Sequence, residues 1–545
     1  MMRHHPIDAD KLSQKWDVIV VGGGINGSAI ARDAALRGLR VLVLEKEDIS
    51  SGTSAWSTRL IHGGLRYLEY FEFYLVRESL SERERLLRNA PHLVKPLGMA
   101  FPFYKQNRRP AWMIRMGMIL YDVLSYDKSL DHHHILSPQQ VFEQVGTLNP
   151  EGLSGAAMYY DCQVAYAERL SVENILSAQE QGAMFLNYAR VNRFIMDGNR
   201  VCGVEFEDLL DQKTYSVSAD LVVNVGGPWV DEVLKGVGKP LKRLIGGTKG
   251  SHLVVPVFPG APKIAVYFEA RKDSRPMFVI PWTGRILIGT TDIPYQGDLD
   301  HVEINDEEMT YLIDETNGIF PSAQINREKI LYTYSGIRPL PYVGEKKTAA
   351  ITRRHIIHDH APEVEGLISI IGGKLTTFRN LAEQCVDLIG KKITRPLQPC
   401  VTHKIHLPGA GDGSFIEFQK QFIAKSGLQQ DVASHLTEIY GVRAEKILAL
   451  TQKEPRLKER LHGGDTTIAA EVIFAFEEEQ AETIQDVLLR RCMGGYNDAA
   501  GLDILEPTIQ VAGDYIGWDK NRREQEKQAY QKYIRRYRPK LLRQP

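Results

Sequence analysis

Cysteine is scarce in this chain and is never paired along the sequence. There are five cysteines in 545 residues, they are scattered, and none forms a CxxC motif. A disulfide framework or a cysteine zinc site would need paired cysteines at short, regular spacing. The sequence therefore argues against a disulfide-rich secreted domain and against a zinc site, and it favours a reducing compartment.

Net charge and long apolar runs are also missing. The formal net charge is −1 at pH 7, so the chain as a whole does not attract nucleic acid or anionic lipid. No apolar run reaches the roughly 18 residues that a membrane-spanning helix needs. The first strand pattern follows about 16 mostly polar residues, so we expect no secretory signal. The adjacent residues His132, His133 and His134 cannot share one face of a helix or strand, so we expect no metal site.

The chain does contain a dinucleotide-binding fingerprint near its start. The apolar run over 17–21 ends in Gly22-x-Gly24-x-x-Gly27, a helix pattern follows, and a second apolar run ends at Glu45. The glycines permit a tight turn close to a pyrophosphate, and the helix N-terminus offers N–H groups and a partial positive charge. Glu45 stands where a carboxylate can accept hydrogen bonds from a ribose. This order of strand, helix, strand and acid predicts an adenine dinucleotide.

Small hydroxyl residues and later glycine turns indicate which dinucleotide is bound. Residues 49–58 are rich in Ser and Thr, which suits the phosphates and ribityl chain of a buried flavin, with a ligand-free surface loop as the alternative. A buried strand over 220–225 ends in a glycine turn, as a second backbone approach to the cofactor requires. The predicted cofactor contacts are Gly22, Gly24, Asn26, Gly27, Glu45, Thr53, Ser57, Thr58, Val191, Gly227, Gly373, Leu375 and Thr376.

The distribution of strand and helix patterns predicts three domains. Residues 240–345 are rich in strand patterns, and the pattern after Pro399 is helical and charged. We therefore predict an α/β plus α fold, with a Rossmann-type flavin-binding domain, an antiparallel-sheet substrate cap and a helical C-terminal domain. The predicted ranges are 16–100, 155–235 and 350–395 for the first domain, 101–154 and 236–349 for the cap, and 400–545 for the third.

Two segments carry a local excess of positive charge. Residues 102–126 mix Arg108, Arg109 and Arg115 with large apolar side chains, as membrane-surface helices do. We favour a helix packed against the core with its arginines reaching water, and membrane contact is the alternative. Residues 519–545 hold ten Lys or Arg against three Asp or Glu. For this tail we favour a solvated end over attraction to anionic lipid or a partner.

Cations that follow strands and glycine turns are candidates for binding a small anion. The planar fork of arginine donates two parallel hydrogen bonds to a phosphate, and lysine adds a point charge. A flavin enzyme that oxidises an alcohol also needs a group that accepts the hydroxyl proton. The candidates are Arg66, Tyr67, His252, Arg275, Arg338, Arg353 and Lys374, which sequence spacing alone does not bring together.

Several motifs are far more specific than a glycine fingerprint. They lie at Leu60–Glu69 (LIHGGLRYLE), Lys249–Pro256 (KGSHLVVP), Ile288–Asp292 (IGTTD), Tyr334–Pro339 (YSGIRP) and Gly372–Arg379 (GGKLTTFR). Together with residues 22–27, they resemble the FAD-dependent, respiratory glycerol-3-phosphate dehydrogenases of the D-amino-acid-oxidase-like flavoprotein superfamily. The resemblance spans about residues 17–379, and the helical C-terminal part fits it more loosely.

The resemblance implies an activity and the residues that perform it. It implies FAD, oxidation of sn-glycerol 3-phosphate to dihydroxyacetone phosphate, and transfer of electrons to a quinone. His252 or, through a water, Arg338 would accept the proton of the C2 hydroxyl while hydride leaves C2 for flavin N5. Histidine suits the role of base and arginine that of electrostatic stabiliser. The implied catalytic residues are His252, Arg338 and Lys374, and the implied substrate contacts are Arg66, Tyr67, Arg275, Arg338, Arg353 and Lys374.

Other activities remain open on the same fold. A glycerol-3-phosphate oxidase would pass electrons to oxygen, although the family's oxidases generally carry an insertion in the cap that 240–345 does not show. An amine, amino-acid or hydroxy-acid oxidase would need a carboxylate-binding arginine and an apolar pocket in place of several cations. A flavin-containing RNA-modifying protein would use the basic tail, but the near-neutral net charge disfavours nucleic acid.

Partners and location follow from the electron acceptor. Quinones are dissolved in the bilayer, so the resemblance implies a cytoplasmic protein attached peripherally to the inner face of the cytoplasmic membrane. The two basic segments are the candidate surfaces, and charge alone does not choose between them. The sequence does not decide the oligomeric state, of which a homodimer is one option.

Overall fold

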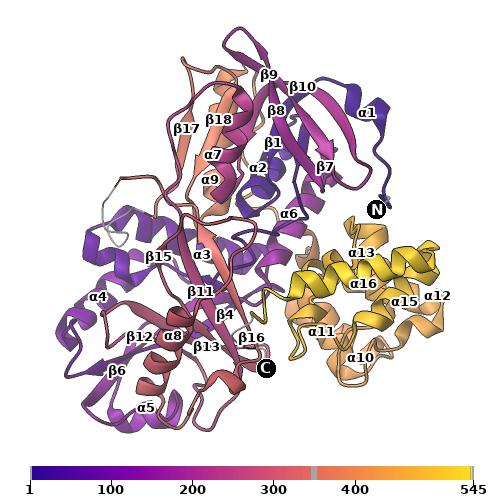
Figure 1. Cartoon of the computed structure of the whole chain (residues 1–545). Coiled ribbons are helices and arrows are strands. Elements are labelled where there is room, and N and C mark those ends of the chain that lie inside the picture. The colour runs from indigo at the N-terminus through magenta and orange to yellow at the C-terminus, as the bar shows by residue number, and fades with distance from the viewer. Residues whose placement is uncertain (1–2, 345–352, 394, 540–541, 543–545) are drawn as a thin grey trace.

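Two β-sheets and a helical domain make up the protein (Figure 1). The computed structural model describes residues 3–344, 353–393, 395–539 and 542. Residues 345–352, which fall in the predicted cap and flavin-binding ranges, and the last residues of the basic tail therefore lie outside the described residues. The predicted fold class, with a Rossmann-type domain, a cap sheet and a helical C-terminal domain, is confirmed.

An eight-stranded sheet forms the upper lobe in Figure 1. Its strands are β1 (Trp16–Val21), β2 (Val41–Leu44), β7 (Met184–Leu186), β8 (Ala189–Asp197), β9 (Arg200–Asp208), β10 (Lys213–Asn224), β17 (Ile356–Asp359) and β18 (Leu367–Ile371). β1 pairs in parallel with β2 on one side and with β10 on the other, and β18 pairs in parallel with β10. The carboxyl ends of these strands therefore meet at one edge, where a dinucleotide-binding sheet holds its ligand.

Both faces of this sheet are covered, which explains why its central strands are apolar throughout. The helices on one face are α2 (Ile25–Leu36), α6 (Ala167–Glu180) and α9 (Phe378–Lys392), and α7 (Val230–Leu234) lies on the other face. Val18 and Val20 pack into the core with α2, whereas Ile19 and Val21 pack into the core with β8, β9 and α7.

A ten-stranded sheet forms the substrate cap. Its strands are β3 (Leu60–Ile61), β4 (Val94–Tyr104), β5 (His134–Leu136), β6 (Leu153–Val164), β11 (Thr248–Pro256), β12 (Ala265–Glu269), β13 (Pro276–Trp282), β14 (Arg285–Gly289), β15 (Ile293–Pro294) and β16 (Tyr332–Arg338). All pairings are antiparallel except the parallel pair of β4 and β12, so the expectation of a largely antiparallel sheet is confirmed.

The pairing of β4 with β6 cuts across the predicted domain boundaries. Residues 94–100 and 155–164 were assigned to the flavin-binding domain, but both segments lie in the cap sheet. A buried strand pattern does not specify which sheet the strand joins, because that depends on distant partners. The helices of the cap are α3 (Phe73–Asn89) and α4 (Ala111–Leu124) on one face, and α5 (Pro138–Gln144) and α8 (Asp306–Ile319) on the other.

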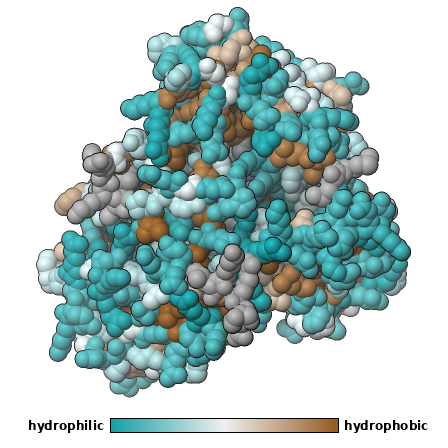
Figure 2. Space-filling model, viewed as in Figure 1, coloured by the Kyte–Doolittle hydropathy of each residue, from teal (hydrophilic) through white to brown (hydrophobic). Residues whose placement is uncertain are grey.

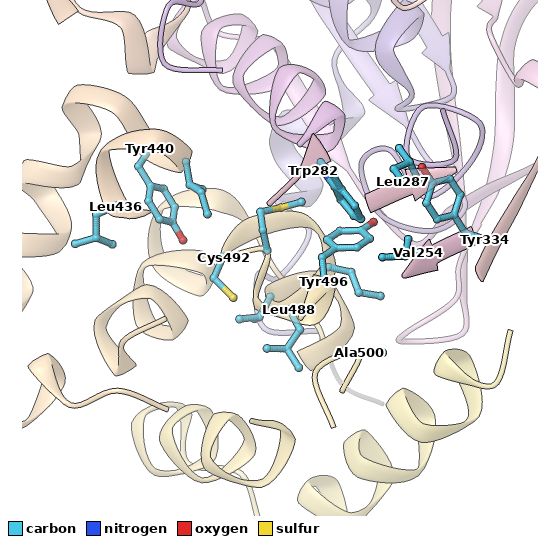
Figure 3. Packing of buried hydrophobic residues seen from close by; sticks show 14 of the residues in the cluster. Val254, Trp282, Leu287, Tyr334, Leu436, Tyr440, Leu488, Cys492, Tyr496 and Ala500 are labelled. Carbon is cyan, nitrogen blue, oxygen red and sulfur yellow. The ribbon is translucent and has the colours of Figure 1, made fainter. Parts of the chain in front are cut away.

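The C-terminal domain shares a hydrophobic core with the cap sheet. Its helices are α10 (Phe415–Lys425), α11 (Gln430–Tyr440), α12 (Ala444–Lys453), α13 (Ala469–Glu479), α14 (Ile484–Asp486), α15 (Leu505–Ile516) and α16 (Lys520–Ile534). One cluster of buried side chains runs from Val254 and Trp282 of the cap to Leu488 and Cys492 of this domain, with Tyr496 between them (Figure 3). The helical region is therefore packed against the rest of the protein.

The basic tail is not the solvated end that its composition favours. Residues 520–534 form α16, and the Tyr537 side chain is only 1% exposed. The backbone N–H of Thr333 in β16 donates to the Tyr537 carbonyl at 2.8 Å, so the chain after α16 joins the cap. Arg523 and Lys527 of α16 pair with Asp514 and Glu506 of the same domain, Arg522 pairs with Glu526 within the helix, and Figure 2 shows the outer face of this domain as hydrophilic. Composition cannot reveal this docking, because the buried tyrosines are spaced among the charges.

A test of the first turn follows from the contact between α2 and β1. A Cβ atom added at Gly27 would lie 1.9 Å from the Gly22 carbonyl oxygen. We expect Gly27→Ala to lower the free energy of unfolding by about 1–3 kcal/mol, measured by urea denaturation, because helix and strand must move apart. An added Cβ at Gly413 meets nothing within 4 Å, so Gly413→Ala is the matched control. Equal unfolding midpoints for the two variants would contradict this account.

Candidate active site

A cavity opens at the carboxyl ends of β1, β2 and β10. Val21, Leu44 and Val225, at or next to the ends of these strands, are part of its lining. Residues of the glycine turn, of the loop over 51–57 and of the segment Gly226 to Trp229 also line it. The predicted cofactor residues that line it are Gly22, Gly24, Asn26, Glu45, Thr53, Ser57, Val191, Gly227, Gly373 and Leu375.

The glycines of the fingerprint keep the backbone open at this cavity. Gly22 has a φ of 118°, and a Cβ atom there would lie 2.6 Å from the carbonyl oxygen of Val225. Gly24 is the N-cap residue of α2 and provides no side-chain cap, so the helix N-terminus faces the cavity without an acidic side chain of its own. A phosphate can therefore approach this end of α2, where the helix dipole is positive.

Two polar side chains of the cavity fit the rest of a dinucleotide. Glu45 accepts hydrogen bonds from the backbone N–H groups of Gly23 at 2.6 Å and Glu47 at 2.9 Å. Burial raises the pKa of Glu45 to about 7 despite these bonds. The Oδ1 atom of Asn26 is buried and has no hydrogen-bond partner among the described residues. Hydroxyl and N–H donors of a bound cofactor would satisfy both groups, so the residues present fit the predicted ligand.

Three predicted cofactor residues are absent from the described lining of this cavity. Gly27 packs against the Gly22 carbonyl, and Thr376 exchanges hydrogen bonds with the backbone of His62. Thr58 lines a neighbouring cavity instead. The sequence reasoning also missed lining residues, namely Lys46, Ser51, Gly52, Ser54, Ala189, Arg190, Trp229, Pro339 and Gly372.

Ser54 shows what the missed residues contribute. Its Oγ accepts a hydrogen bond from the N–H of Ile25 at 3.0 Å, so it caps α2 from a separate loop. The hydroxyl-rich run contained the signal for Ser54, whereas no local pattern distinguishes Lys46, whose ammonium group lies 4.1 Å from the Trp229 ring centre.

A second cavity, of about 330 Å³, adjoins the first. Thr53, Pro339, Gly372, Gly373 and Lys374 line both cavities, so a ligand in one would face a ligand in the other. All six predicted substrate contacts line this second cavity: Arg66, Tyr67, Arg275, Arg338, Arg353 and Lys374. Residues separated by up to 308 positions thus converge on one space of small-molecule size.

Asp292 holds the arginines of this cavity in place. Its carboxylate accepts from Arg338 at 3.2 Å and from Arg353 at 3.0 Å, and its backbone carbonyl accepts from Arg275. Although burial opposes the shift, Arg338 and Arg353 hold the pKa of Asp292 below its usual value. Asp292 was not among the predicted site residues, although it ends the conspicuous motif over 288–292. Because two guanidinium groups share this one carboxylate, positive charge is left for an anion.

Lys374 adds a buried cation to the same cavity. Its Nζ lies 3.3 Å from Ser79 Oγ and 3.8 Å from the centre of the Tyr67 ring. Burial lowers the pKa of Lys374 to about 7, although Glu78 and Glu72 act in the opposite direction. A phosphate in the cavity would favour the protonated form of this side chain.

The two histidines near the cavity have different positions. His252 is not among the described residues that line either cavity; its Nε2 lies 3.0 Å from Thr58 Oγ1 and its ring stacks on Tyr334. His62, which was not among the predicted site residues, lines the second cavity. Burial lowers the pKa of His62 to about 4 and that of His252 far below its usual value, so both imidazoles are neutral at pH 7. The prediction of His252 as base therefore needs a relay through Thr58.

The part of the chain that the structure describes contains no cluster of metal ligands and no helix able to span a membrane. No group of three or more His, Cys, Asp and Glu side chains there is placed to hold a metal ion. His132 and His133 both face Asp122, which also pairs with Lys128. Among the described helices, none has the length and apolarity needed to cross a bilayer.

The known families that match this chain agree with the ligands expected for the two cavities. Residues 17–379 match the family of FAD dependent oxidoreductases, and residues 400–523 match the C-terminal domain of alpha-glycerophosphate oxidase. The first match covers the strands, the glycine turn and the whole cap sheet. The fold and the family therefore define an FAD-dependent oxidoreductase, and the lining of the first cavity is compatible with FAD.

Individual relatives narrow this class. A glycerol-3-phosphate dehydrogenase of Synechocystis sp. is 47% identical over 95% of this chain and 96% of its own length. An aerobic glycerol-3-phosphate dehydrogenase of Staphylococcus epidermidis is 34% identical over 94% and 92%. The chain belongs to the glycerol-3-phosphate dehydrogenases within the FAD-dependent oxidoreductase family, which confirms the resemblance found in the sequence motifs.

Solved structures show the same architecture. The glycerol-3-phosphate dehydrogenase of Bacillus halodurans, solved in complex with FAD, superimposes with a TM-score of 0.80 at 27% identity, covering 97% of this chain and 96% of that one. An L-alpha-glycerophosphate oxidase of Mycoplasma pneumoniae with FAD bound gives a TM-score of 0.54 at 17% identity over 72% of this chain, which shows a shared fold only.

Glu45 offers a direct test of the first cavity. Glutamine has one carbonyl oxygen, so Glu45→Gln cannot accept from Gly23, Glu47 and a ribose in the same way as the carboxylate. We expect the FAD dissociation constant to rise about tenfold, measured by flavin fluorescence on reconstitution of the apoprotein. Glu47, whose only described contact with Glu45 is through its backbone, provides Glu47→Gln as the control. An unchanged FAD affinity in Glu45→Gln would show that the Glu45 carboxylate does not contribute to FAD binding.

Proposed function

We propose that this protein oxidises sn-glycerol 3-phosphate to dihydroxyacetone phosphate and that the electrons pass to a membrane quinone. The observation that carries the proposal is the group of five cations in a cavity that shares its wall with the FAD cavity. The full-length similarity to glycerol-3-phosphate dehydrogenases supports it. FAD, when bound, supplies the acceptor for the hydride that leaves C2 of the substrate.

Binding of the substrate phosphate is assigned to the arginines and Lys374. The Arg338 and Arg353 guanidinium groups are oriented by Asp292, so their remaining N–H groups are placed in advance for the phosphate oxygens. Lys374 lines both cavities and can contact the substrate at the end that faces the cofactor. Anchoring one end of a three-carbon substrate in this way orients C2 toward the shared wall, which is where oxidation must occur.

We assign to His62 the role of accepting the proton of the C2 hydroxyl. Its imidazole lines the substrate cavity and is neutral at pH 7, so it can accept a proton without first losing one. Lys374 lies close enough to lower the pKa of His62. Once the phosphate neutralises these cations, the imidazole becomes a better acceptor. His252 would take a supporting position, holding Thr58 at the edge of the cavity.

The decisive experiment is anaerobic addition of sn-glycerol 3-phosphate to the purified flavoprotein. We expect the visible absorbance of oxidised flavin to bleach, and we expect glycerol at the same concentration to leave it unchanged because glycerol lacks the phosphate. Slow recovery of the colour in air and fast recovery with a soluble quinone would support a dehydrogenase. Fast recovery in air with release of peroxide would identify an oxidase. Bleaching by an amino acid and not by sn-glycerol 3-phosphate would overturn the substrate assignment.

Peripheral attachment to the membrane is assigned to one face of α4. Trp112, Met116, Ile119 and Val123 recur at helical spacing and are 66%, 59%, 51% and 61% exposed. Ile114, Met118 and Tyr121 on the opposite face are buried, so the expected packing against the core holds for that face only. An amphipathic helix with an apolar outer face suits a lipid surface.

The surroundings of α4 favour lipid over another occupant. Arg108 and Arg115 are exposed beside the apolar face, where they can contact anionic headgroups, whereas Arg109 is engaged by Glu69 and Glu269. Phe71 and Tyr74 extend the exposed apolar surface and follow η1 (Leu65–Tyr70), which lines the substrate cavity. A membrane on this face would bring its quinone near the oxidation site. The five free cysteines agree with the cytoplasmic side.

The buried lysine predicts a dependence of substrate binding on pH. Because burial places the Lys374 pKa at about 7, the free enzyme loses this charge as the pH rises above 7. The substrate phosphate, with a second pKa of about 6, stays a dianion in this range. We expect KM to rise about tenfold between about pH 7 and pH 9, and Lys374→Arg, which stays protonated, to give a flatter profile. Parallel profiles for the two proteins would contradict the assignment.

Rapid kinetics can distinguish the roles of His62 and His252. We expect His62→Asn to slow anaerobic flavin reduction by about 100-fold or more, since the hydroxyl proton loses its acceptor. His252→Asn should slow it by less than about tenfold, because His252 acts through Thr58. The converse pattern would return the role of base to His252.

The membrane assignment is tested by co-sedimentation with vesicles that contain anionic lipid. We expect the variant Trp112→Gln, Met116→Gln, Ile119→Gln to lose about tenfold or more in binding, because the apolar face no longer inserts. The control carries Lys520→Gln and Lys532→Gln, two exposed residues of α16. Loss of binding in the control and retention in the α4 variant would place the contact on the basic tail.

A further inference from the structure

One segment of the FAD cavity has little regular structure of its own. Residues 48–58, which we call the cofactor loop, consist of turns, and Ser50 adopts a left-handed φ of 60°. Ser51, Gly52, Thr53, Ser54 and Ser57 of this loop line the cavity. A loop that provides so much of a ligand site must be held by contacts outside itself, because its own hydrogen bonds close only short turns.

The first end of the cofactor loop is held by the C-terminal domain. The Asp48 carboxylate accepts from Arg490 Nε at 2.6 Å and from Arg491 Nη1 and Nη2 at 2.8 and 2.9 Å. All three residues are buried. The arginines lie more than 440 positions away in the sequence, in the turn that follows α14.

The charges of this buried cluster are balanced. Arg490 also donates to Asp486 at 2.6 Å, so two carboxylates face two guanidinium groups. Asn187 donates to the remaining face of Asp48 at 3.2 Å, and Tyr188 donates to Asp486 at 2.7 Å. Burying charges is costly unless each one is paired and hydrogen-bonded, and this cluster meets both conditions.

The second end of the cofactor loop is held by Glu168 of α6, and the C-terminal domain supports this contact through Tyr496. Arg59 directly follows the loop, is fully buried, and forms two hydrogen bonds of 2.8 Å with Glu168. It also donates to the Ala55 carbonyl within the loop at 3.2 Å. Tyr496 of the C-terminal domain donates to Glu168 at 2.7 Å, and its ring centre lies 4.9 Å from the Arg59 guanidinium carbon. In Figure 3, Tyr496 lies between the C-terminal helices and Trp282 of the cap.

From these contacts we infer that the C-terminal domain is part of the FAD site: Arg490, Arg491 and Tyr496 are positioning residues that clamp both ends of the cofactor loop and thereby set how tightly FAD is retained. The inference rests on FAD as cofactor and not on the proposed substrate. With the clamp in place, the loop is ordered before the cofactor arrives. Without it, binding of FAD would have to supply the order of the loop and would be weaker.

The test compares FAD affinity among full-length variants. Arg491→Met removes two of the donors to Asp48, and Tyr496→Phe removes one hydroxyl from Glu168. We expect the FAD dissociation constant to rise about tenfold in Arg491→Met and about fivefold in Tyr496→Phe, measured by flavin fluorescence on reconstitution of apoprotein.

A control separates a clamp from general stability. Arg443 pairs with Glu479 inside the C-terminal domain and has no described contact with the cofactor loop. The backbone carbonyl of Glu479 accepts from Arg491, but Arg443→Met removes a side-chain ion pair and leaves every donor to Asp48 and Glu168 in place. We expect its FAD dissociation constant to stay within about twofold of the unmodified protein even where the melting temperature falls. If Arg491→Met does not fold, Tyr496→Phe decides the question. FAD affinity in Tyr496→Phe equal to that of Arg443→Met would overturn the inference.

Discussion

The buried carboxylate of Asp48 constrains both the cofactor loop and the C-terminal domain. A buried carboxylate is stable only if cations reach it, and here both cations come from the far end of the chain. Asp48 stands three residues after Glu45, so a contact from the last domain reaches the cofactor-binding edge of the first sheet. The C-terminal helices are therefore a structural part of a site to which they contribute no lining residue among those described.

Charge and burial also determine the properties of the substrate cavity, but there the positive charges are only partly compensated. Four arginines and a lysine line one small space, and like charges at close range repel each other. Asp292 compensates for part of this charge, and burial brings the pKa of Lys374 near neutrality, so the empty cavity carries less charge than its composition suggests. An incoming dianion restores the charge of the lysine and satisfies the arginines. The cavity is in this sense specific for an anion before any substrate is present.

Local sequence patterns correctly predicted those features of this protein that depend on residues close together in the chain. The tight turn at Gly22 to Gly27, the acid at Glu45 and the strand patterns of the cap depend on neighbours in the chain, and the structure shows them as expected. The specific motifs also identified the correct family, and all six predicted substrate contacts line one cavity, four of them from these motifs. Ser54 was within reach of the same reasoning, since it belongs to the hydroxyl-rich run that was recognised.

Other features depend on contacts between distant segments. The sequence patterns of β4 and β6 do not predict which sheet these strands join. The residues around Tyr537 do not predict that this tyrosine of the charged tail is buried. His252 and His62 both lie in motifs recognised in the sequence, yet only His62 is among the described residues of the cavity, because which side chain reaches the cavity depends on distant packing partners. The sequence by itself determined the cofactor class, the family and the chemistry of the binding groups, since these follow from residue type and short spacing. Only the tertiary structure decided which groups meet, because burial and pairing are set by the whole chain at once.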